Sequence, residues 1–89
     1  MRPYQDKQIK DNTLVREFNS LNDESEFVWH RDEHDRDVEV LKCGNGWMFQ
    51  YDNELPFPLT EGDFIKIKKG EWHRLHKGSD SLLIKINNY

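Results

Sequence analysis

Short segments in which apolar and polar residues alternate dominate this sequence, and no stretch keeps a helical period. They are separated by Gly, Asn, Asp and Pro at a spacing of roughly 8–12 residues, which is typical of strands in sandwiches and barrels. Alternate side chains of a strand point to opposite faces, so each segment can bury one face. Strands are predicted at 14–18, 26–30, 37–43, 47–51, 64–68, 72–76 and 82–86, with an irregular edge segment at 55–59. The pattern predicts an all-β fold.

The segments before and between these strands are predicted to be loops and turns. Residues 1–12 are polar and indicate a loose lead-in, while 20–25 favour a turn or a single helical turn. The run Cys43-Gly44-Asn45-Gly46 indicates a tight hairpin, because Gly and Asn tolerate positive φ. No repeat or change of composition divides the chain, so residues 1–89 are predicted to form one domain.

Composition supports a small folded core. The chain has 89 residues, 34% of them charged, yet 12% are aromatic, which disordered chains usually lack. A chain of this size buries a little over ~60% of the surface that its unfolded form exposes. Its stability is therefore expected to be marginal and to gain from a metal or from dimerisation.

Net charge, cysteine content and hydropathy indicate which partners and which cellular compartment to expect. The net charge is −4, and the only basic run, at 66–69, is followed by Glu71, so nucleic-acid binding is not expected. Cys43 is the single cysteine, which rules out an internal disulfide and favours a reducing compartment. No apolar stretch approaches the ~20 residues that span a bilayer, and the N-terminus lacks the apolar core of a signal peptide. A cytoplasmic protein without a membrane partner is predicted.

Residues 62–77 contain the first sign of a functional site. Two Gly-containing turns enclose one short strand, and the next strand carries His73 and Leu75 on the same face. A core-facing histidine needs partners for its ring nitrogens, and a metal ion is one such partner. His76 has the opposite parity and is expected to face outward.

The charged run at residues 29–37, WHRDEHDRD, offers further ligands. Imidazole and carboxylate together suit Fe(II), Mn(II), Ni(II) or Zn(II), and a mixed set is typical of open, catalytic-type sites. His30 and Asp32 have the parity to point the same way if their strand continues, and His73 would meet them from another strand as a metal ligand, with His34 and Asp37 as further candidates. The alternative is a solvated turn held by Asp–Arg pairs, with Asp35 and Arg36 as a structural ion pair.

The spacing around His73 follows a recognisable order. Gly62, Gly70 and His73 stand where a motif Gly, five residues, Pro, any residue, Gly, two residues, His, three residues, Asn requires them. Lys68 and Lys77 replace the usual Pro and Asn. This stretch resembles the second motif of the cupins, small β-barrels whose two motifs supply a metal site.

The first cupin motif runs His, any residue, His, three or four residues, Glu, six residues, Gly. His30, Asp32, Asp37 and Gly44 resemble it, with both middle ligands changed to Asp. The Gly expected six residues before the first His is absent, since Glu24 stands there.

A second register also fits, with Asp32, His34, Glu39 and Gly46 in the same four positions. The first register is preferred because it begins with a true histidine. The resemblance covers residues 14–87 and is to very short single-domain cupins, often unannotated and some phage-encoded. It implies a jelly-roll barrel.

Arg31 and the aromatic face of 47–51 are candidate ligand-binding residues. The planar fork of Arg31 can hold a substrate carboxylate if it enters the barrel mouth. Trp47, Phe49 and Tyr51 share one face of their strand and either line an apolar pocket or form plain core.

The sequence therefore predicts a small cupin-like protein that binds Fe, Mn, Ni or Zn inside the barrel, together with a small polar or anionic ligand. The competing hypothesis is a metal-free interaction module that uses the barrel as a rigid surface. If the chain is an enzyme, the resemblance implies oxygenase, isomerase or hydrolase-like chemistry, but fold does not select a reaction. Short cupins commonly pair, so a homodimer through the N-terminal strand or 55–59 is expected.

Overall fold

The computed structural model describes residues 4–19 and 27–89, and these contain eight strands and no helix. The strands are β1 (Tyr4–Lys10), β2 (Thr13–Phe18), β3 (Arg36–Cys43), β4 (Met48–Tyr51), β5 (Phe57–Pro58), β6 (Phe64–Ile67), β7 (His73–His76) and β8 (Leu82–Asn88). The all-β prediction is confirmed. The predicted turn at 20–25 lies outside the described residues.

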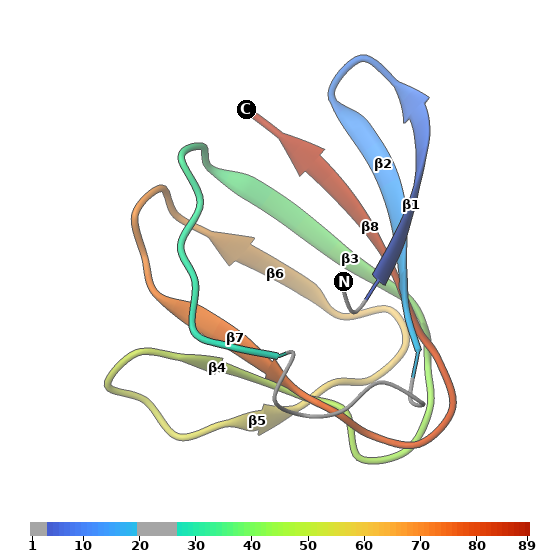
Figure 1. Ribbon diagram of the computed structural model, residues 1–89, viewed down its shortest axis with the longest axis vertical. Coiled ribbons are helices and arrows are strands. Elements are labelled where there is room, and N and C mark those ends of the chain that lie inside the picture. The colour runs from blue at the N-terminus through green and yellow to red at the C-terminus, as the bar shows by residue number, and fades with distance from the viewer. Residues whose placement is uncertain (1–3, 20–26) are drawn as a thin grey trace.

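The strands form two antiparallel sheets that face one another as a jelly-roll barrel (Figure 1). The larger sheet has the order β1-β2-β8-β3-β6, and the smaller has the order β5-β4-β7. Strands distant in the chain are thus neighbours, since β2 pairs with β8, and β3 lies between β8 and β6. This closure brings β7 and the segment before β3 together at one side of the barrel.

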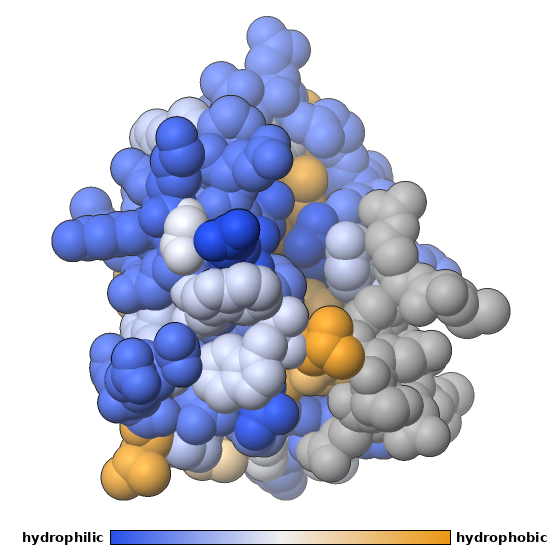
Figure 2. All heavy atoms as spheres, turned by 60° about the vertical axis from the view of Figure 1, so that its left-hand side comes forward, coloured by the Kyte–Doolittle hydropathy of each residue, from blue (hydrophilic) through white to orange (hydrophobic). Residues whose placement is uncertain are grey.

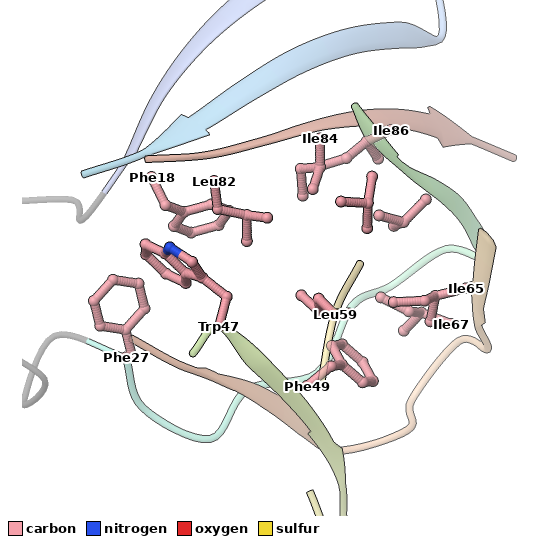
Figure 3. Close-up of a cluster of buried hydrophobic side chains, with 12 residues drawn as sticks. Phe18, Phe27, Trp47, Phe49, Leu59, Ile65, Ile67, Leu82, Ile84 and Ile86 are labelled. Carbon is pink, nitrogen blue, oxygen red and sulfur yellow. The ribbon is translucent and has the colours of Figure 1, made fainter. Parts of the chain in front are cut away.

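The core lies between the sheets and is made by inward side chains at alternate strand positions. Its buried members are Phe18, Phe27, Val38, Val40, Trp47, Phe49, Leu59, Ile65, Ile67, Leu82, Ile84 and Ile86. Figure 3 shows Phe18, Phe27 and Trp47 grouped at one end and Ile65 and Ile67 at the other. Each fully buried aliphatic side chain of this kind stabilises the fold by about 1.5–3 kcal/mol. The alternation in the sequence is therefore the main determinant of which face each strand buries.

The predicted loose lead-in at residues 1–12 is wrong from Tyr4 onward, because Tyr4–Lys10 is β1. It pairs along its length with β2, and six of its seven residues are exposed. Backbone pairing, the Tyr4–Phe18 ring contact at 5.4 Å and the Arg16–Asp6 ion pair hold it in place. An edge strand without a buried face leaves no hydrophobic alternation to detect.

The predicted hairpin at 43–46 is also wrong, because β3 and β4 lie in different sheets. Gly46 does have positive φ, at 86°, but the turn carries the chain across the barrel. Gly44 is needed for another reason: a Cβ atom there would collide with the Ser79 carbonyl oxygen. The turn chemistry indicated a bend correctly, but not which strands would pair.

The predicted strand at 26–30 is reduced to one bridge. Among residues 27–30, only His30 pairs, through two backbone hydrogen bonds of 3.0 and 2.9 Å with His73. Phe27 is buried while Trp29 and Val28 are exposed, so the predicted alternation of faces fails before His30.

Of the two segments predicted as edges, 55–59 contains β5, an edge strand of the smaller sheet, whereas the predicted N-terminal strand at 14–18 is β2, which lies between β1 and β8. The homodimer through such an edge stays a prediction. Figure 2 shows a mostly hydrophilic face on which hydrophobic side chains reach the surface in a few small places. No helix within residues 4–19 and 27–89 is long and apolar enough to cross a membrane.

Candidate metal centre

The bridge between His30 and His73 creates the site. Its two backbone hydrogen bonds place the segment before β3 alongside the start of β7, and the two imidazole rings meet edge-on with centroids 4.3 Å apart. Asp32 follows two residues after His30, and its carboxylate reaches the ring of His73. Barrel closure thus brings together three of the five predicted ligands.

His73 is the buried member, with 3% of its surface exposed. Its Nδ1 lies 2.8 Å from the carbonyl oxygen of Glu71, which can only accept, so Nδ1 carries the proton and Nε2 is left with a lone pair. Its ring stacks on Phe49, with centroids 5.6 Å apart and planes 20° from parallel. A neutral imidazole held in this way is ready to bind a metal through Nε2.

Burial is the main reason that the pKa of His73 lies below its usual value. The backbone hydrogen bond to Glu71 and the charge of Asp32 oppose this shift, while His30 and Arg36 add to it. The net direction favours the neutral ring, which is the form that coordinates metals.

His30 is more exposed but is oriented similarly. Its Nδ1 lies 3.1 Å from the carbonyl oxygen of Val28, so the neutral ring again keeps Nε2 free as a ligand atom. A backbone carbonyl that accepts from the other ring nitrogen is the usual way in which a ligating histidine is oriented.

Asp32 has the least satisfied atom of the site. Its Oδ1 lies 3.2 Å from Nη1 of Arg36, but its buried Oδ2 accepts no hydrogen bond. Nε2 of His73 lies 3.4 Å from this Oδ2. With His73 neutral, both of these atoms present lone pairs to one another. An orphaned buried acceptor costs about 1–3 kcal/mol, and a cation between the two atoms would remove that cost.

The donor set fits a divalent transition metal. One ligand atom from each of His30, Asp32 and His73 lies within 4.8 Å of the others. Ligands bound at ~2.0–2.2 Å from one ion lie about 3–4 Å apart, so only a small closure of these side chains is required. Two histidines and one carboxylate with open positions form the 2-His-1-carboxylate set of non-haem Fe(II) centres.

The other two predicted ligands are not brought into this group. His34 is exposed on the loop before β3. Asp37 precedes the buried Val38 in β3, so it lies on the outer face, where it accepts a 2.6 Å hydrogen bond from the hydroxyl of Tyr89. Strand alternation turns Asp37 away from His73, and Arg36 takes the inward position instead.

A cavity of about 380 Å³ adjoins the three candidate ligands between the sheets. Of the predicted ligand-binding residues, Phe49 lines it and Trp47, Tyr51 and Arg31 do not. Trp47 is fully buried core and donates from Nε1 to the Ser79 carbonyl at 3.0 Å, while the Tyr51 hydroxyl donates to the carbonyl of Lys66. Arg31 is exposed over the ring of Trp72 at 5.2 Å.

Arg36 lines the cavity beside the candidate ligands, where sequence reasoning did not place it. The predicted Asp35–Arg36 ion pair is not formed: Arg36 pairs with Asp32 and Asn88, and Asp35 accepts from the backbone N–H of Lys69 at 2.7 Å. The spacing of the first cupin motif could have indicated this position. The cupin motif allows three or four residues before its glutamate, and with three the position is Arg36.

Comparison with solved structures identifies the architecture. A cupin-2 domain protein from Shewanella frigidimarina superposes with a TM-score of 0.68 at 17% identity, over 97% of this chain and 79% of that one. A cupin domain from Bordetella pertussis gives 0.63 at 17% identity, over 100% and 97%. The Fe(II) form of HppE gives 0.67 at 13% identity, over 86% and 41%, so the present chain matches less than half of HppE.

No protein-family model matches the sequence, and no curated protein matches it either. The structural likenesses, each below 20% identity, therefore show the fold alone. That fold is the cupin fold, as the two motif resemblances predicted.

Proposed function

We propose that this small cupin-fold protein binds one divalent transition metal ion through His30, Asp32 and His73, next to a cavity that admits a small molecule. The observation that carries the proposal is the pair of lone-pair atoms, Asp32 Oδ2 and His73 Nε2, that face one another 3.4 Å apart in a buried position. With His73 neutral, a cation between these two acceptors would satisfy both of them.

Iron(II) is the ion that the donor set favours, with Mn(II), Ni(II) and Zn(II) as alternatives. The likeness to a protein solved as its Fe(II) form supports this order. A bound ion would supply Lewis-acid or redox chemistry at its open positions. The chain's own residues orient the ligands: Glu71 and Val28 hold the two imidazoles, and Phe49 stacks on one of them.

The inward Arg36 makes this donor set less negative than one with a second carboxylate. It neutralises one oxygen of Asp32 and leaves the other for the ion. Asp32 is thus held in place by a charge-assisted contact, much as outer-shell partners hold ligating carboxylates in known metal sites. Three protein ligands leave positions at which a small molecule from the cavity can bind.

The experiment is a calorimetric titration of chelator-stripped protein with Fe(II) under anaerobic conditions, and with Mn(II) and Zn(II). One ion per chain is expected. Asp32→Asn keeps the shape of the side chain but removes its charge, and should weaken binding at least about tenfold. His34→Ala, on the same loop but outside the group, is the matched control and should bind as the parent does.

The opposite outcome would support the competing hypothesis of a metal-free interaction module. If the folded chain takes up none of these ions, or if Asp32→Asn and His34→Ala bind them equally well, the three residues do not form a metal centre. The exposed side chains around the bridge, Trp29 and Trp72 among them, would then be the natural starting point for a search for partners.

A further inference from the structure

The walls of the cavity beside the candidate metal centre combine apolar surface with very few charges. Apolar side chains form most of the lining, among them Val38, Ile65 and Ile84 from the larger sheet and Phe49 and Leu75 from the smaller. Among the residues that the structure describes, the charged lining residues are Arg16, Arg36 and Asp32, which give the cavity two positive groups and one negative group. A divalent ion would add two further positive charges. Such a cavity favours an anion with an apolar body.

The two arginines differ in how much of their charge is free. Arg16 forms a bidentate pair with Asp6, at 2.7 and 3.0 Å, and lies 3.8 Å over the ring of Tyr4. Its charge is therefore already compensated by a carboxylate that is not part of the cavity lining. Arg16 shapes the cavity but offers little attraction for a second anion.

Arg36 keeps a donor edge available. Its Nε donates to Oδ1 of Asn88 at 2.7 Å, and its Nη1 lies 3.2 Å from Oδ1 of Asp32. Within the described part of the chain, its Nη2 has no partner. Two of its nitrogens are thus anchored by different elements, which fixes the plane of the guanidinium and lowers the entropic cost of binding a further anion.

Asp32 links this arginine to the metal site. One carboxylate oxygen contacts Arg36 and the other faces His73, so a ligand that reaches the ion also passes the guanidinium. A carboxylate group can contact both at once, with one oxygen on the ion and the other accepting a charge-assisted hydrogen bond from Nη2 of Arg36. Occupancy of the ion and of the anion should therefore strengthen one another reciprocally.

We propose that Arg36 is the anion-binding residue of this cavity, and that the cavity takes a small monocarboxylate with a short, branched or aromatic apolar body. The inference rests on the proposed metal site, which it deepens by naming the class of ligand. A volume of about 380 Å³ excludes large ligands, and walls with few hydrogen-bonding groups do not suit sugars or other polyols.

The test compares isovalerate with isovaleramide, which have the same shape but differ in charge. Both are titrated calorimetrically into Zn(II)-loaded and into chelator-stripped protein. The parent should bind isovalerate at least about tenfold more tightly than the amide, and more tightly with Zn(II) than without it. Arg36→Gln should remove most of that preference, and Arg36→Lys should restore only part of it, because an ammonium lacks the planar fork.

Lys66→Gln is the control for the loss of one positive charge, because Lys66 is exposed on β6 with buried neighbours on either side. It should bind isovalerate as the parent does. Equal binding of acid and amide by the parent, or unchanged isovalerate affinity in Arg36→Gln, would overturn the assignment. Since Arg36 contacts Asp32, circular dichroism and Zn(II) titration of each variant show whether it still folds and loads.

Failure of the metal site is distinguishable from failure of this inference. A parent protein that binds no Zn(II) but prefers isovalerate through Arg36 refutes the metal centre and keeps the anion site. A parent that binds Zn(II) but does not distinguish acid from amide keeps the metal centre and refutes the anion site. If Arg36→Gln does not fold, the acid–amide comparison in the parent and the Arg36→Lys result decide.

Discussion

His30→Ala separates the structural from the metal-binding role of the site most cleanly, because His30 is exposed and His73 is not. In the metal-free protein the substitution removes one exposed hydrogen bond to Val28 and one ring contact, and leaves the backbone bridge to His73 in place. A single hydrogen bond contributes about 0.5–1.5 kcal/mol, and exposure reduces that value. The metal-free variant should therefore lose less than about 1 kcal/mol of unfolding free energy.

The loss should be much larger when metal is present. An ion at 100 times its Kd stabilises the native state by about 2.7 kcal/mol. For a chain of this length each kcal/mol raises Tm by about 4–8 °C, so loading the parent should raise Tm by about 11–22 °C. If the loss of one ligand weakens binding about 100-fold, the same ion concentration stabilises the variant by only about 0.4 kcal/mol.

Thermal unfolding with and without Zn(II), followed by circular dichroism, measures both effects. The expected result is a parent with a large metal-induced rise in Tm and a His30→Ala variant with almost none, although their metal-free Tm values are similar. His34→Ala serves as control and should keep the full rise. A His30→Ala variant that retains the metal-induced rise would refute the shared site, and so would a His34→Ala variant that loses it.

Two further predictions concern pH and backbone packing. Because burial lowers the folded-state pKa of His73 below the ~6.5 of an unfolded histidine, the unfolded chain binds the proton first. The stability that this residue contributes to the metal-free protein should be present above pH ~6.5 and lost as pH falls through the folded pKa. In urea unfolding, the free energy of unfolding of His73→Gln should therefore fall less over that pH range than that of the parent. Gly44→Ala should destabilise the fold by about 3 kcal/mol because the new methyl group meets the Ser79 carbonyl, whereas Gly62→Ala, in open space at φ 92°, should cost about 1 kcal/mol. Equal midpoints for the two glycine variants in urea would contradict this reading of the turns.

Patterns within single segments of the sequence were enough to predict the class of fold and the inward face of most strands. Alternation in 37–43 and 64–68 placed Val38 and Ile65 in the core, because burying one face of a strand leaves a period of two in its own residues. The same parity turned His73 inward, and the turn residues marked where the chain bends. These are local properties, and a single chain segment contains all the information they require.

Which strands pair and which side chains meet depends on contacts between segments that are distant in the chain. No local pattern distinguishes a hairpin at 43–46 from a crossing between sheets, and β1 has no buried face to give it a pattern. The choice of Asp32 over His34 and Asp37, and the inward place of Arg36, depend on one backbone bridge between positions 30 and 73. That bridge forms only when the barrel closes, since bringing such distant segments together costs loop entropy that the whole core must offset.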